Sequence, residues 1–135
     1  MLCTLFTKYL QYDSCQSLRC ISRDLYMKAA SKEINGYLVS KQITDIVYVL
    51  RKYAEKDRIR SFALFLCKAF TIIPFCKEDI ESAADLNGKD FEDDILIQIA
   101  ETNSIDCIVT NNTKDFLAFS NQVFRPDELL KTLFR

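Results

Sequence analysis

Hydrophobic positions along the chain follow two spacings in turn, and this alternation predicts the order of the secondary structure. Short apolar runs bounded by polar residues predict strands at 37–39, 71–74 and 106–110. Between these runs, apolar residues recur three or four positions apart, as on the buried side of a helix. Strand and helix alternate along the whole chain, which favours an α/β fold: a three-layer α/β/α sandwich with a mainly parallel sheet.

The helical spacing also gives approximate boundaries. We expect helices at 24–32, at 41–55, at 62–70, near 80–84, after Asp90 and from Pro126. Asn35-Gly36 is a usual signal that a helix has ended, and Ser40 is placed to cap the next helix because its hydroxyl can accept from an unpaired backbone amide. A last short strand is expected at 123–124.

The N-terminal region is the hardest to interpret. Residues 2–6 suggest a short strand, whereas the following residues are aromatic, polar and only weakly periodic. At 135 residues the chain is expected to form one domain, 1–135, with 1–24 as an atypical N-terminal region. No apolar run reaches the roughly 18 residues of a membrane helix, so we expect a soluble cytoplasmic protein without membrane contact.

The amino-acid composition limits the catalytic and metal-binding chemistry open to this chain. The chain has six cysteines, with no Cys-x-x-Cys pair, and no histidine. We therefore expect reduced core thiols, and histidine-based catalysis and most transition-metal sites are excluded. The remaining chemistry relies on carboxylates, hydroxyls, amides or lysine. Clustered aspartates favour a hard ion such as Mg²⁺ or Mn²⁺.

The charge balance excludes a general electrostatic affinity for nucleic acid, because the net charge is −1. One basic run comprises Arg51, Lys52, Lys56, Arg58 and Arg60. Such a run is most often the solvated face and end of a helix, and this is the interpretation we adopt for it.

An acidic segment, Asp90-Phe91-Glu92-Asp93, stands before an apolar helix. Asp90 is placed to cap that helix and Asp93 occupies the third helical position, as in an imperfect capping box. Asp94 adds another charge, and three repelling carboxylates in one turn exceed what a cap needs. A bound cation would relieve this repulsion.

Further polar candidates lie beside strands. Asn112 and Asp115 follow the strand predicted at 106–110, and ligands of open α/β sheets gather at the carboxyl ends of strands. Both residue types also form ordinary turns. Asp45 lies at the edge of the apolar stripe of its helix, where it either points along a cleft or simply interacts with the helix dipole.

Three motifs together resemble one known family. Thr44-Asp45-Ile46, the acidic segment ending in Asp93, and Thr110-Asn111-Asn112 followed by Lys114-Asp115-Phe116 are similar in order and spacing to PIN-domain nucleases, which include VapC-type toxin ribonucleases. The resemblance covers residues 25–135. It implies a central parallel sheet, a Mg²⁺ or Mn²⁺ ion, hydrolysis of RNA phosphodiester bonds and a small antitoxin protein as partner. A homodimer is left open.

The resemblance also implies roles for individual residues. The catalytic acids would be Asp45, Asp93 and Asp115, of which Asp93 and Asp115 would be metal ligands. Asp45 stands where many members have glutamate, and being shorter it would act through a water. Thr110 and Asn112 would hold the loop at the strand end, and Asp90 would support the site without binding the metal ion itself.

One part of the family pattern is absent. Family members open with a strand that ends in Asp-Thr-Asn, and this chain has no such motif, so its first strand is expected to be degenerate or missing. If residues 2–6 replace that strand, Thr7 or Lys8 falls near the first ligand position. We expect residues 1–24 to be either a truncated or frame-altered version of the N-terminus of a longer relative, or a degenerate copy that no longer cuts.

Two functions from different classes follow. The first is a metal-dependent endoribonuclease of toxin–antitoxin type with impaired activity. The second is a catalytically silent PIN-like module that binds RNA or an antitoxin. A phosphoacceptor receiver domain is a weaker third interpretation, because the paired acids and the late lysine of that class are absent.

Overall fold

The computed structural model describes residues 3–6 and 16–133. The described strands form one five-stranded sheet in the order β3-β2-β1-β4-β5, and every neighbouring pair is parallel. The strands are β1 Cys3–Phe6, β2 Asn35–Val39, β3 Thr71–Ile73, β4 Cys107–Val109 and β5 Gln122–Phe124. The helices are α1 Gln16–Ala30, α2 Ser40–Leu50, α3 Lys56–Ala69, α4 Lys77–Ala83, α5 Phe91–Thr102 and α6 Pro126–Leu133, with a 3-10 helix η2 at Thr113–Phe116.

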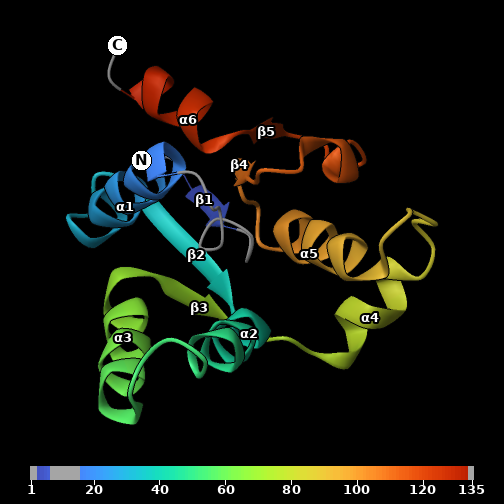
Figure 1. The fold of residues 1–135 in the computed structure, drawn as a ribbon. Coiled ribbons are helices and arrows are strands. Elements are labelled where there is room, and N and C mark those ends of the chain that lie inside the picture. The colour runs from blue at the N-terminus through green and yellow to red at the C-terminus, as the bar shows by residue number, and fades with distance from the viewer. Residues whose placement is uncertain (1–2, 7–15, 134–135) are drawn as a thin grey trace.

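Side chains alternate between the two faces of the sheet, and each face carries its own core. On one face Leu38 and Val109 pack in a cluster with residues of α1, α3 and α6. On the other face Val39 and Ile108 pack in a cluster with residues of α5 and with Phe116 of η2. Helices therefore cover both faces, as Figure 1 shows. The three-layer α/β/α sandwich with a parallel sheet is confirmed.

The strand predictions agree closely with this sheet. Residues 37–39 lie in β2, and β3 ends at Ile73, one residue before Pro74. β3 stands at an edge, where a proline at the strand end removes no ladder hydrogen bond. The prediction of 106–110 corresponds to β4, whose residues are all buried.

A short first strand is present. β1 stands in the centre of the sheet, between β2 and β4, and the Thr4 hydroxyl lies 3.3 Å from the Cys107 thiol of β4. A strand is therefore present at residues 3–6. That it is a degenerate form of the family's first strand stays a prediction. The candidates Thr7 and Lys8 lie outside the described residues. The single-domain assignment of 1–135 stays a prediction.

Two predictions around β2 were wrong. Asn35-Gly36 does not end a helix but begins β2, and α1 ends earlier, at Ala30. Gly36 is required for packing, because a Cβ there would lie 2.6 Å from Cδ1 of Phe70 and 2.9 Å from Cβ of Ala29. The helix also begins at Gln16 rather than at 24, which the weak periodicity of this segment does not reveal.

Ser40 is not the helix cap. The chain enters α2 through Val39, whose N–H donates to the buried side chain of Gln42 at 2.7 Å. The Ser40 hydroxyl instead accepts from the backbone N–H of Phe75 at 3.1 Å and so ties α2 to the segment after β3. α2 ends at Leu50 rather than near 55, and α3 and α4 each begin earlier than their apolar spacing suggests.

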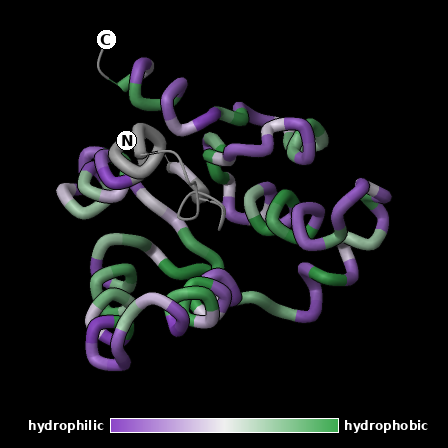
Figure 2. Tube along the Cα trace, in the orientation of Figure 1, coloured by the Kyte–Doolittle hydropathy of each residue, from purple (hydrophilic) through white to green (hydrophobic). Residues whose placement is uncertain are grey.

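Hydropathy along the chain follows this architecture (Figure 2). The connection between α4 and α5 is mainly hydrophilic, whereas β2 becomes hydrophobic only toward its carboxyl end, at Leu38-Val39. Among the described helices, none is both long and apolar enough to cross a membrane. The five basic residues of the run from Arg51 to Arg60 are all exposed, as expected for a solvated face.

Candidate functional site at the carboxyl edge of the sheet

The parallel sheet brings the candidate acids to one edge. α2, which carries Asp45, follows directly on the carboxyl end of β2, and η2, which carries Asp115, follows β4. α5 leads back to the start of β4, so its first turn, with Asp93, begins near the same edge. β1 lies between β2 and β4, and the chain crosses to opposite sides of it, which makes this edge the switch point where open α/β sheets bind ligands.

Two of the acidic residues at the start of α5 have structural functions. Oδ1 of Asp90 accepts from the backbone N–H of Glu92 at 2.9 Å and of Asp93 at 3.4 Å, so Asp90 is the helix cap that the sequence predicted. Asp94 is buried, and its Oδ2 accepts from the N–H of Gly88 at 2.9 Å. The crowding of carboxylates is thus partly resolved, because Asp94 faces the α4–α5 connection.

A pocket of about 130 Å³ lies between the first turns of α2 and α5. Its charged lining residues are Lys41, Asp45, Glu92 and Asp93. The rest of its lining is mostly apolar and consists of Val39, Gln42, Phe75, Ile95, Leu96 and Ile99. Asp93 is only 3% exposed, so its carboxylate belongs to the interior of the site rather than to the solvated surface. The structure therefore brings Asp45 and Asp93 together in one pocket.

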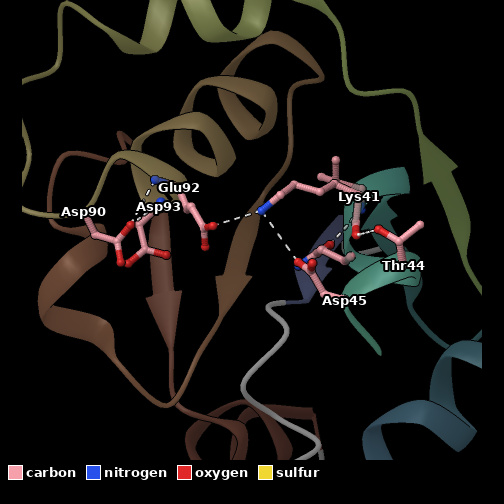
Figure 3. Close-up of polar contacts among 8 residues, drawn as sticks. Lys41, Thr44, Asp45, Asp90, Glu92 and Asp93 are labelled. Carbon is pink, nitrogen blue, oxygen red and sulfur yellow. Dashed lines mark hydrogen bonds and ion pairs between the residues drawn. The ribbon is translucent and has the colours of Figure 1, made fainter. Parts of the chain in front are cut away.

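A lysine joins the acids of this pocket. Nζ of Lys41 lies 3.1 Å from Oε1 of Glu92 and 3.6 Å from Oδ2 of Asp45 (Figure 3). The hydroxyl of Thr44 donates to the carbonyl of Lys41 at 2.7 Å, within the same helical turn. The ammonium group thus links α2 to α5 at the pocket, through Asp45 and Glu92.

The loop after β4 forms a compact unit of its own. Thr110 is fully buried, its N–H donates to the carbonyl of Phe124 at 3.0 Å, and its Oγ1 accepts from the N–H of Asn112 at 3.0 Å. The Asn112 amide in turn donates to Oδ2 of Asp115. This chain of contacts orients Asp115, and the roles of Thr110 and Asn112 at a catalytic site stay predictions. Asp115 itself is not among the residues that line the pocket.

The donor chemistry of the site fits a hard divalent ion. Carboxylate oxygens are the ligands that Mg²⁺ and Mn²⁺ prefer, and Mg²⁺ commonly takes one or two of them together with waters. Within residues 3–6 and 16–133, however, no three acidic or cysteine side chains form a group that could hold a metal ion by themselves. The residues present thus fit an ion held by few carboxylates. The catalytic and ligand roles of Asp45, Asp93 and Asp115 stay predictions.

Sequence reasoning missed Lys41. Its spacing to Asp45, four residues along one helix, is a pattern that predicts an ion pair, so a signal was available. Its contact with Glu92 joins residues distant in the chain and leaves no local signal. The bond from Gly88 to Asp94 was missed as well, although a glycine shortly before an acidic helix start hints at a close approach of backbone and side chain.

The fold and this edge define an α/β/α protein whose parallel sheet carries acids at the carboxyl ends of its strands. The sequence matches the model of the PIN domain over residues 20–114, which is most of the chain. The protein therefore belongs to the PIN-domain family. A search of curated protein sequences finds no significant match.

Solved structures share the fold at low sequence identity. The structure of FitAB bound to an IR36 DNA fragment is similar with a TM-score of 0.63 and 16% identity, over 91% of this chain and 94% of that one. A toxin–antitoxin complex from Klebsiella pneumoniae gives 0.60 and 20%, over 91% and 97%. FitAcB from Neisseria gonorrhoeae gives 0.58 and 17%, over 91% and 97%. At these identities the likeness shows the fold.

Proposed function

We propose that this PIN-domain chain is a metal-dependent endoribonuclease of toxin–antitoxin type whose activity is impaired. The observation that carries the proposal is the pocket at the carboxyl edge of the sheet, where Asp45 and the buried Asp93 lie together. Two acids from different elements meet in a cleft at the switch point of a parallel sheet, and a cap and a hydrogen-bonded loop support the neighbouring elements. RNA is the proposed substrate.

Mg²⁺ or Mn²⁺ is the proposed cofactor. Asp93 and Asp115 would hold the ion, and Asp45 would act through a water. When bound, such an ion polarises a phosphoryl oxygen and lowers the pKa of a neighbouring water, so that hydrolysis needs no histidine.

The protein's own residues would set the geometry for this reaction. Asp90 fixes the backbone of the first turn of α5 and with it the position of Asp93. Thr110 and Asn112 hold the loop and orient the carboxylate of Asp115. The apolar wall of the pocket, with Phe75 and Leu96, would keep bulk water away from one side of the acids.

A small antitoxin protein is the proposed partner. One of the similar structures is a toxin–antitoxin complex, and another is FitAB bound to DNA. The fold that this chain shares with those proteins supports a comparable partner. Formation of a homodimer also stays a prediction.

A catalytically silent PIN module is the second candidate. Two observations favour it: the strand Cys3–Phe6 carries no acid, and the ammonium of Lys41 already contacts Asp45 and Glu92. A cation supplied by the protein neutralises acids that would otherwise attract a metal ion. Such a module would keep the fold and its binding to RNA or antitoxin without cleaving RNA.

An RNase assay on the purified chain separates the two functions. We expect slow cleavage that is faster with Mn²⁺ than with Mg²⁺, because Mn²⁺ demands less ideal coordination, and we expect Asp93→Asn to abolish it. Asp85→Asn is the matched control, since Asp85 is an exposed acid before the same helix. Absence of cleavage with either metal would overturn the nuclease proposal. Robust Mg²⁺-dependent cleavage abolished by Asp93→Asn would remove the silent module.

A further inference from the structure

Lys41 occupies an unusual place for a lysine. It is the second residue of α2, so its charge lies at the positive end of the helix dipole, where a cation is disfavoured. Its side chain is 41% exposed and contacts two carboxylates, one on its own helix and one on α5. Helix stability therefore does not explain the position of Lys41, whereas the charges around it do.

The negative charges around Lys41 come from two elements. Asp45 belongs to α2, and Glu92 and Asp93 belong to the first turn of α5, and all three line the pocket that Lys41 also lines. Carboxylates that line one pocket repel one another, more strongly where burial lowers the local dielectric, as at Asp93. The cluster is more stable with a positive charge between its members. Lys41 supplies one from within the chain.

We propose that Lys41 is a built-in counter-ion of this acidic pocket, which holds α2 against α5 and competes with a divalent cation for the negative charge of the pocket. An ammonium group and a divalent ion repel each other within one small pocket, so each would displace the other. The pocket would then take up a divalent ion only when Lys41 moves away. The inference depends on the proposed function in one respect, the choice of Mg²⁺ or Mn²⁺ as the divalent ion.

The contacts also indicate how the exchange would proceed. Both ion pairs of Lys41 are partly exposed, with Glu92 52% and Asp45 34% exposed, so they are weak enough to open in water. Asp93, in contrast, is buried and stays in the pocket. A divalent ion would bind at Asp93, with Asp45 reaching it through a water, and the freed ammonium would turn outward to solvent.

Lys41→Met tests this, because methionine keeps an apolar stem and removes the charge. We expect Mn²⁺ binding, measured by calorimetry, to tighten several-fold, the size expected when two partly exposed ion pairs no longer compete with the metal ion. We also expect a lower melting temperature in EDTA and a larger rise on adding Mn²⁺ than in the unaltered chain. Lys41→Arg, which keeps the charge, should behave like the unaltered chain.

Lys77→Met is the matched control, because Lys77 likewise pairs with an acid four residues on, Glu81, at 3.4 Å but on α4 outside the pocket. It should leave Mn²⁺ affinity unchanged. If Lys41→Met fails to fold, Lys41→Gln serves, since its amide can still donate to Glu92. Mn²⁺ affinity that is unchanged in the charge-removing variants, or raised equally by Lys77→Met, would overturn the inference.

The two proposals fail separately. If Lys41→Met binds Mn²⁺ more tightly but cleaves no RNA, the role of Lys41 as counter-ion is supported and the nuclease proposal is wrong. If the chain cleaves RNA with Mn²⁺ but its Mn²⁺ affinity is the same with and without the Lys41 charge, the nuclease proposal stands. The proposed competition between Lys41 and the metal ion is then wrong.

Discussion

The buried carboxylate of Asp94 accepts a hydrogen bond of 2.9 Å from the backbone N–H of Gly88 and so closes the connection between α4 and α5. The approach is close because Gly88 has no side chain: a Cβ there would lie 2.2 Å from Oδ1 of Asp94. Asp94 follows directly on Asp93, so this bond fixes the first turn of α5 on the side away from the pocket.

Gly88→Ala is expected to destabilise the protein, because Asp94 would have to move and its bond to the backbone would break. Losing a hydrogen bond to a charged group costs about 1.5–3 kcal/mol, and we expect a loss of unfolding free energy of that order in urea titrations. In the background Asp94→Ala the same substitution should cost much less. Equal costs in both backgrounds would show that the contact is not the cause.

Part of this architecture could be predicted from local pattern. The residues of β4 are all buried, because helices cover both faces of the sheet, and such strands appear in sequence as short continuous apolar runs. The cap at Asp90 was predictable for a similar reason, since capping depends only on residues within one turn.

The remainder depends on contacts between distant segments. Gly36 has the local signature of a helix end, yet it lies in β2, where Phe70 and Ala29 leave no room for a side chain. Ser40 has the signature of a cap, yet its hydroxyl accepts from Phe75, which follows the neighbouring strand β3. In both cases tertiary packing outweighs local preference, and a single sequence does not contain that information.

The candidate site was likewise predictable from the sequence only in part. The types and order of its acids were visible, because the motifs at Asp45, Asp93 and Asp115 are short. Their meeting in space was not, since it depends on how α2 and α5 pack. The ion pair of Lys41 with Glu92 joins residues far apart in the chain, so only the folded structure reveals the cation within the acidic pocket.

Asp90→Ala is expected to lower the unfolding free energy by about 1 kcal/mol, the usual cost of losing a helix cap. The reason is that the N–H groups of Glu92 and Asp93 would lose their acceptor. Chemical denaturation measures this effect. Asp90→Asn, whose side-chain oxygen can still accept, serves as the control and should lose only a fraction of that amount. A loss as large for asparagine as for alanine would argue against capping.

The thiol of Cys76 provides a test of the start of α4. Its pKa is raised, chiefly because the thiol donates a hydrogen bond to the carboxylate of Asp79 at 3.1 Å. A raised pKa leaves less thiolate at a given pH, and the thiolate is the reactive form. We therefore expect Asp79→Asn to speed alkylation of Cys76 near pH 8, because the charge is removed while an acceptor for the Cys76 N–H remains.

Peptide mapping by mass spectrometry follows Cys76 separately from the other cysteines. The rate of Cys76 alkylation should rise with pH in both proteins, and it should rise at lower pH in the Asp79→Asn variant. Cys67, an exposed thiol on α3, is the internal reference whose rate should not change between the two proteins. Identical pH profiles for Cys76 in both proteins would contradict the contact with Asp79.

Asn112→Asp tests whether the loop after β4 belongs to a cation site. The Asn112 amide donates to Asp115, so a carboxylate in its place would face a like charge. The two residues are at least partly exposed, and we therefore expect a modest destabilisation in EDTA, on the order of 0.5 kcal/mol. Mn²⁺ would be attracted by the added charge, so it should raise the melting temperature of this variant more than that of the unaltered chain.

The comparison needs a control that adds the same charge elsewhere. Gln122→Glu does so at the exposed first residue of β5, which lies at the opposite, amino end of the parallel sheet. If Mn²⁺ stabilises both variants equally, the response reflects only the net charge of the chain, and Asp115 would be removed from the proposed site. A response confined to Asn112→Asp places a cation beside Asp115. Because Asp115 follows β4 and Asp93 opens the helix before β4, that result would support one ion shared by the two acids.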